Sequence, residues 1–169
     1  QNSSRKGKVG ESQLEKILYN IFEKENGYIE NKSKEDHVGD FWITIPPKVK
    51  KNRKTMDPDK EITIMIDAKN YTTTIPKDEI EKMKADMDLN PEWDMAIMTG
   101  LGPVNIANTC TMKQPVNYEI YKGRPLVYAI DVLNQPDNLL WSYQTGLICI
   151  ANKDSIENIS QNKMFRDFL

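Results

Sequence analysis

Three residues at the ends of two predicted strands could together bind a metal ion and act on a phosphate. Asp40 stands directly before the apolar run 41–45, and Asp67 closes the apolar run 62–67. Lys69 follows two residues later, so an extended strand points its ammonium and the Asp67 carboxylate to the same face. If the two runs pair as antiparallel neighbours, Asp40 lies beside Asp67.

These side chains are suited to the hydrolysis of a phosphodiester. Two carboxylates that converge at the end of a sheet repel each other unless a cation lies between them. Oxygen ligands select a hard cation, so we expect Mg²⁺, with Mn²⁺ able to replace it. The Ala68 carbonyl could add an oxygen, and Lys69 could orient or deprotonate the metal-bound water or balance the phosphate charge. The alternative for an isolated Asp-x-Lys is a turn and a surface ion pair, but the apolar runs beside both aspartates favour the site.

Glu11 is the fourth candidate for the same site. An amphipathic helix is predicted over 11–24, and we expect Gly7 and Gly10 to set its start. Glu11 could then be a metal ligand, or it could complement the dipole at the start of the helix, and both alternatives stay open.

A further group of residues is expected to contact nucleic acid, because it is basic or polar and lies beside the predicted site or in a lysine-rich loop. The net charge of −2 argues against a general affinity for polyanions, so a local grip on the phosphate backbone is needed. The alternative for the lysine-rich loop is a solvated surface. The candidates are Lys48, Lys50, Lys51, Arg53, Lys54, His37, Asn70 and Tyr71.

The remaining pattern predicts the elements that must position these side chains. A strand begins at Tyr28, and a helix over 76–87 opens on Pro76, with Asp78 and Glu79 complementing its dipole. Segment 131–141 is ambiguous. Further strands are predicted over 95–99, 118–121, 126–130 and 147–151, and a terminal helix over 155–168. This order predicts an α/β sandwich with a mixed central sheet.

Gly39-Asp40 followed by Asp67-Ala68-Lys69, behind a helix that starts Gly-Lys-Val-Gly-Glu11, resembles the PD-(D/E)XK nuclease superfamily. The stretches His-Val-Gly-Asp (37–40) and Asp-Ala-Lys-Asn-Tyr (67–71) look closest to its Mrr-like and Holliday-junction-resolvase-like members. The resemblance covers roughly residues 7–100. It departs from the usual motif where Gly39 replaces proline and where an aspartate replaces the more frequent glutamate at 67.

The resemblance implies a restriction-endonuclease-like α/β/α sandwich with an αβββαβ core. It also implies a Mg²⁺-dependent DNA endonuclease, in preference to an exonuclease, with Glu11 completing the metal site. A homodimer would suit the cutting of two strands. The alternative is a catalytically inactive nucleic-acid-binding module on the same fold.

Length and composition are those of one globular domain. The 169 residues, 38% hydrophobic and 28% charged, predict a single domain over 1–169 in which 104–169 completes the fold. No apolar run has the length of a membrane span, so we expect no membrane partner. With two cysteines and no Cys-x-x-Cys pair, we expect no zinc site and an intracellular, reducing compartment, cytoplasmic or nuclear. Because the chain opens on Gln1, we expect a piece of a longer protein.

Overall fold

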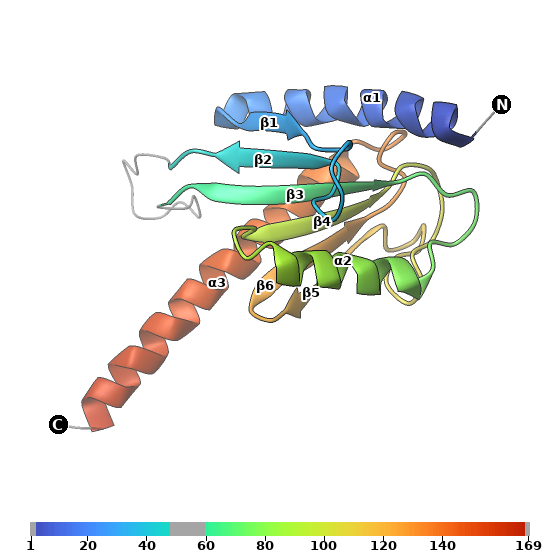
Figure 1. Cartoon of the computed structure of the whole chain (residues 1–169). Coiled ribbons are helices and arrows are strands. Elements are labelled where there is room, and N and C mark those ends of the chain that lie inside the picture. The colour runs from blue at the N-terminus through green and yellow to red at the C-terminus, as the bar shows by residue number, and fades with distance from the viewer. Residues whose placement is uncertain (1–2, 48–59, 168–169) are drawn as a thin grey trace.

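A mixed β-sheet of six strands forms the centre of the computed structural model, which describes residues 3–47 and 60–167 (Figure 1). The strand order is β1-β2-β3-β4-β6-β5. The predicted α/β class with a mixed central sheet is therefore confirmed. In chain order the described elements are α1 (Ser3–Phe22), the 3₁₀ turn η1 (Glu23–Glu25), β1 (Tyr28–Asn31), β2 (Phe41–Ile45), β3 (Ile62–Lys69), α2 (Lys77–Leu89), β4 (Met95–Gly100), β5 (Val116–Tyr121), β6 (Arg124–Ala129) and α3 (Asp137–Asp167).

The pairing of β2 with β3 decides where the candidate residues lie. The two strands are antiparallel, as predicted, with Ile45 opposite Ile62 at one end and Phe41 opposite Ile66 at the other. β3 runs parallel to β4, and β4 runs parallel to β6, while β1 and β5 pair antiparallel at the two edges. The start of β2 and the end of β3 therefore meet at the same end of the sheet.

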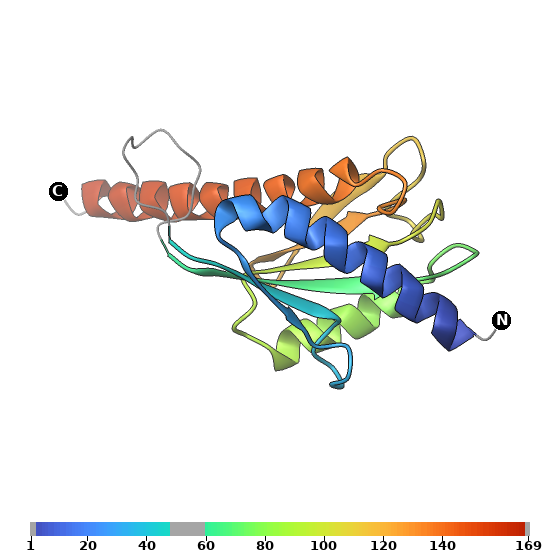
Figure 2. The ribbon, with the colours of Figure 1, turned by 90° about the horizontal axis from the view of Figure 1, so that it is seen from above.

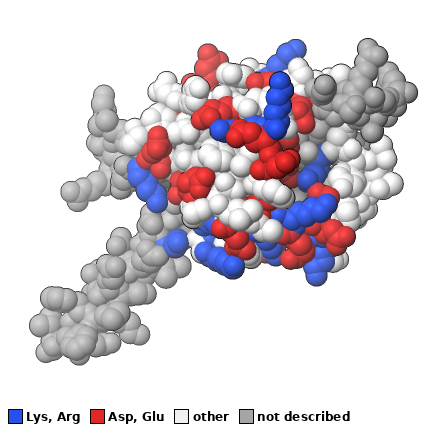
Figure 3. Space-filling model, viewed as in Figure 1, with Lys and Arg blue, Asp and Glu red and all other residues white. Residues whose placement is uncertain are grey.

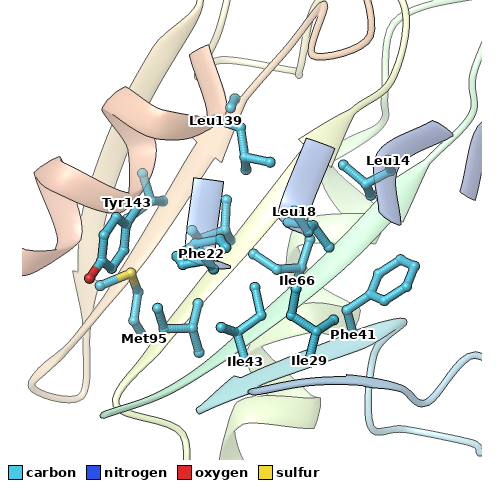
Figure 4. Close-up of a cluster of buried hydrophobic side chains, with 14 of the residues drawn as sticks. Leu14, Leu18, Phe22, Ile29, Phe41, Ile43, Ile66, Met95, Leu139 and Tyr143 are labelled. Carbon is cyan, nitrogen blue, oxygen red and sulfur yellow. The ribbon is translucent and has the colours of Figure 1, made fainter. Parts of the chain in front are cut away.

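Helices cover both faces of this sheet (Figure 2). α1 and α3 lie over one face, and α2 lies over the other. The larger core lies beneath α1 and α3, with Leu14, Leu18 and Phe22 contributed by α1 and Leu139 and Tyr143 by α3 (Figure 4). The rings of Phe22 and Tyr143 join the two helices in an edge contact, with their centroids 4.9 Å apart. Each helix thus turns its apolar stripe towards this core.

Side chains of β3 alternate between these two faces. Ile64 and Ile66 are buried in the core under α1 and α3, whereas Met65 is buried in the smaller core under α2. Because the alternation has a period of two, Asp67 and Lys69 project on the α2 face. The site therefore forms between the end of β3 and the helix α2.

α1 begins at Ser3, so the prediction that Gly7 and Gly10 set the start of this helix is wrong. Gly10 lies inside the helix and is buried, and a Cβ added there would stand 2.7 Å from Leu101 Cδ1. The glycine thus permits a close approach between α1 and the chain that follows β4. Glu11 consequently lies in the third turn of α1, beyond the reach of the dipole at the helix start.

The strand predicted over 147–151 is also wrong, because these residues belong to α3. Leu139, Tyr143, Leu147 and Ile150 recur at helical spacing, and all four pack against the core under α1 and α3. A short apolar run cannot distinguish strand from helix by itself. α3 has 31 residues, yet no helix within 3–47 and 60–167 has both the length and the apolar character that crossing a membrane requires.

Candidate active site

The structure places Asp40 beside Asp67, as the antiparallel pairing predicts. The β2–β3 ladder ends at the Phe41–Ile66 pair, and the Asp40 N–H donates to the Ile66 carbonyl at 3.0 Å, one residue out of that register. Asp40 and Phe41 therefore both stand against Ile66, as at a β-bulge. The Asp40 carboxyl group nevertheless reaches that of Asp67, and the two share a side-chain hydrogen bond.

Asp40 is held by the backbone on either side of it. Its Oδ2 accepts a hydrogen bond from the Ala68 N–H at 2.7 Å. Gly39, directly before it, has φ +76°, and a Cβ at this position would collide with the Met65 side chain. Proline is restricted to φ near −65°, so the chain cannot place the common proline here. Gly39 is what allows Asp40 to turn towards β3.

Ionising both the Asp40 and the Asp67 carboxyl group is unfavourable, and the pKa of each is raised. Burial raises the pKa of Asp67 to about 7, Lys69 lowers it and Asp40 raises it. Burial also raises the pKa of Asp40, while the Ala68 N–H and a hydrogen bond with Asp67 lower it. Either a proton or a cation between the two carboxyl groups would relieve this repulsion.

Glu11 lies on α1, which covers the face of the sheet opposite to α2 (Figure 2). The charge of Glu11 raises the pKa of Asp40, although burial is the larger cause, so the two carboxylates lie within electrostatic range of each other. Among residues 9–47 and 60–153, whose side chains the structure describes, no three His, Cys, Asp or Glu side chains are already arranged to hold a metal ion. The described candidate ligands are therefore the Asp40–Asp67 pair, with Glu11 nearby on α1.

Lys69 is held between two carboxylates. Its Nζ lies 3.0 Å from Asp67 Oδ2 and 2.7 Å from Glu79 Oε2 on α2. Burial lowers the pKa of Lys69, but Asp67 and Glu79 outweigh burial and hold this pKa above its ordinary value. Lys69 is therefore a cation at neutral pH, which argues against the expectation that it deprotonates water. Orienting water or balancing phosphate charge remain open to it.

Glu79 is the site residue that the sequence pattern did not single out. We expected it only to complement the dipole of the α2 helix, and its position in the first turn is consistent with that. The signal lay in the helical period: Glu79 precedes the buried Met83 by four residues, so both lie on the side of α2 that faces β3.

A pocket of about 270 Å³ lies between β3 and α2. Its polar lining consists of Asp67, Lys69, Glu79, Lys82, Asp86 and His37. Over the face that carries α2, acidic and basic side chains are interspersed and do not form separate fields (Figure 3). Side chains of both charges thus surround this pocket.

Three of the candidates for nucleic-acid contact, His37, Asn70 and Tyr71, are among the described residues, and they lie at different places relative to the pocket. His37 adopts φ 63°, and its Nδ1 lies 3.2 Å from Asp86 Oδ1 on the rim of the pocket. Tyr71 is partly buried, and both burial and its contact with Glu79 raise its pKa. Asn70 is exposed, and its amide lies next to Gly10 of α1, on the opposite side from the pocket.

Lys48, Lys50, Lys51, Arg53 and Lys54, the basic stretch expected to grip phosphates, lie outside the described residues. The described residues that flank this stretch enter the sheet at the Ile45–Ile62 pair. Ile45 is five residues from Asp40 along β2, which corresponds to about 17 Å at 3.4 Å per residue. The Ile45–Ile62 pair thus lies at the end of these strands away from the candidate site.

Comparisons of the chain with protein-family models, with curated proteins and with solved structures find no match. The argument for function therefore depends on the geometry and chemistry of the site.

Proposed function

We propose that this protein is a metal-dependent nuclease that hydrolyses phosphodiester bonds, most simply a DNA endonuclease. One observation carries the proposal: the Asp40 and Asp67 carboxyl groups share a hydrogen bond at a strand end, and Lys69 Nζ lies 3.0 Å from Asp67 Oδ2. Two partly buried carboxylates in contact are costly without a compensating cation. A pocket lined by Asp67 and Lys69 leaves room for a substrate group.

The residues present fit a hard divalent cation. Asp40 and Asp67 would hold it, and Glu11 would complete the set from α1. The Ala68 carbonyl projects to the same side of β3 as the Ala68 N–H, which points to Asp40, so it is a fourth oxygen donor. When bound, Mg²⁺ or Mn²⁺ would polarise the phosphate and lower the pKa of a water molecule. Carboxylate and carbonyl oxygens are the donors these ions prefer.

The chain itself would supply positioning and charge. Lys69 would offer a fixed ammonium to a phosphate oxygen or to the attacking water, because its pKa keeps it protonated. Asp40 would be kept in place by the Ala68 N–H, and Asp67 by its strand, whose carbonyl at this residue accepts a hydrogen bond from the Thr99 hydroxyl at 2.8 Å. Such rigid placement favours in-line displacement at phosphorus.

The order of the first elements supports a restriction-endonuclease-like fold as part of this proposal. α1, β1, β2, β3, α2 and β4 follow one another in the αβββαβ order of that core, with helices on both faces of the sheet. Fold alone does not define function, so the proposal depends on the site.

The test is incubation of the purified protein with single-stranded, duplex and branched DNA, and with RNA, in Mg²⁺ or Mn²⁺. We expect cleavage that a chelator stops and that Asp67→Ala and Lys69→Ala each reduce by at least about 100-fold. Lys77→Ala, which removes an exposed lysine of α2, is the control and should cleave normally. Equal cleavage by the wild type, Asp67→Ala and Lys69→Ala would contradict the proposal. Tight DNA binding without cleavage in either metal would instead support the nucleic-acid-binding module.

A further inference from the structure

The Glu79 carboxylate connects α2 to the lysine of the candidate site. Its Oε2 lies 2.7 Å from Lys69 Nζ, and its Oε1 lies 3.2 Å from Lys82 Nζ. The Glu79 side chain is only 11% exposed, whereas that of Lys82 is 71% exposed. Ion pairs between exposed side chains contribute little to stability. An ion pair between two largely buried side chains instead has a well-defined geometry. The Glu79–Lys69 contact is of this second kind, since Lys69 is only 20% exposed.

A lysine needs such a partner if its ammonium is to stay in one place. Its four-carbon stem is flexible, and Lys69 could otherwise swing across the pocket. In the structure Asp67 and Glu79 both hold it. Asp67 would share its charge with the cation once a metal binds, and its attraction for Lys69 would weaken. Glu79, which comes from α2 and contacts Lys69 independently of Asp67, would then be the main anchor of the ammonium.

We propose that Glu79 is the positioning residue of Lys69: it holds the ammonium at the β3 side of the pocket, where the ammonium meets a phosphate oxygen. The inference rests on the proposed nuclease function. It gives α2 a part in catalysis that does not require Glu79 to touch the metal or the substrate.

The competing explanation is that Glu79 only complements the positive end of the α2 dipole. Asp78 provides a matched control for that explanation, because it shares the first turn of α2 and is exposed. If the dipole were the whole role, Glu79→Gln and Asp78→Asn would lower the melting temperature similarly, and neither would alter Lys69.

The experiment combines kinetics with chemical labelling in the wild type, Glu79→Gln, Asp78→Asn, Lys69→Ala and the double variant Glu79→Gln/Lys69→Ala. We expect Glu79→Gln to lower kcat by about 10- to 100-fold with KM and the Mn²⁺ midpoint unchanged, the usual effect of removing a group that orients a site residue. The same change in the Lys69→Ala background should have no further effect, since the two residues act together. Asp78→Asn should leave kcat unchanged. Glu79→Asp, which keeps the charge, covers the case in which Glu79→Gln unfolds, and it should retain part of the activity.

Labelling with an amine-acetylating reagent, read by peptide mass spectrometry, tests the contact without any turnover. Lys69 should react several-fold faster in Glu79→Gln than in the wild type, relative to the exposed Lys77 as internal reference. Unchanged labelling of Lys69 would overturn the contact. An equal loss of kcat on adding Glu79→Gln to the wild type and to Lys69→Ala would overturn the positioning role. Absence of wild-type cleavage would overturn the proposed function and with it the catalytic role of Glu79, while faster labelling would still uphold the contact.

Discussion

The Ala68 N–H donates to Asp40 Oδ2 at 2.7 Å, so the middle residue of Asp67-Ala68-Lys69 holds the first aspartate through its backbone. The Ala68 side chain meanwhile packs against the core under α1 and α3. The tripeptide is therefore divided by the pleat of β3, with two functional side chains towards the pocket and one methyl group towards the core. This division explains why a small apolar residue suffices between them.

Mn²⁺ should stabilise the folded protein, because a ligand that binds only the native state raises its stability. At a concentration 100 times its Kd the gain is about 2.7 kcal/mol, or a rise in melting temperature of roughly 5–10 °C for a chain of this size. Asp67→Ala should abolish the rise, and Asp78→Asn should preserve it. Differential scanning fluorimetry with a Mn²⁺ titration measures both. An equal rise in Asp67→Ala would place the ion elsewhere.

Glu11→Gln should weaken Mn²⁺ binding, because the Glu11 carboxylate lies within electrostatic range of Asp40. We expect a loss of about 10-fold in metal affinity. Glu15→Gln is the matched control, one turn along the same helix. Isothermal titration calorimetry with Mn²⁺ compares the two variants. Equal affinities in both would restrict the ligands to the ends of β2 and β3.

Gly39→Ala should destabilise the protein by about 2–4 kcal/mol. A side chain at φ +76° is strained, and the new Cβ would collide with the Met65 side chain. Cleavage should also fall, because Asp40 follows directly. Gly102→Ala is the control, since a Cβ there meets nothing within 4 Å. Urea unfolding of both variants provides the comparison, and equal midpoints would show that residue 39 tolerates a side chain.

Acid should weaken a contact between β5 and α2. Glu119 lies 2.8 Å from Lys84 Nζ and accepts a hydrogen bond from the Tyr128 hydroxyl at 2.6 Å. Partial burial raises the pKa of Glu119, but Lys84 and Tyr128 outweigh it and hold the pKa below its usual value. The contribution to stability is therefore present above the unfolded pKa of about 4.3 and is lost as pH falls through the lower folded pKa.

Glu119→Gln should accordingly lower the free energy of unfolding by about 1 kcal/mol at pH 7, a value reduced because the ion pair is partly exposed. The loss should become smaller as the pH approaches 3.5. Urea unfolding at several pH values measures the difference from the wild type. Glu92→Gln, at an exposed position, is measured alongside as the reference variant. A difference that stays constant from pH 7 to pH 3.5 would rule out the ionised Glu119 as its source.

The β2–β3 part of the site could be predicted from the sequence because its geometry is local. A period of two places Asp67 and Lys69 on one face, and a hairpin pairing brings Asp40 to the same strand end. Neither inference needs knowledge of the rest of the fold. The mixed central sheet of the described residues follows in the same way from apolar runs bounded by turns, although its number of strands does not, because the pattern of the helical run 147–151 also predicts a strand.

The parts that could not be predicted depend on contacts between distant elements. Glu79 belongs to the site only because α2 crosses the face of β3, and no local pattern specifies that crossing. Position 10 of α1 is a glycine, and a Cβ there would stand 2.7 Å from Leu101 Cδ1, a contact that the sequence does not reveal. In isolation, a glycine before an apolar stripe indicates a helix start. The run at 147–151 is helical because its apolar residues continue the buried stripe of α3.

The alternation along β3 also protects the site against misassembly. A shift of one residue in the pairing of β3 would turn Asp67 and Lys69 into the core under α1 and α3 and move Ile64 and Ile66 to the α2 side, where the polar pocket lies. Two charges placed among apolar side chains would cost more than a domain of this size can tolerate. Every molecule that reaches the native state therefore has its candidate residues correctly presented, and the fraction of competent molecules in a preparation should equal the folded fraction.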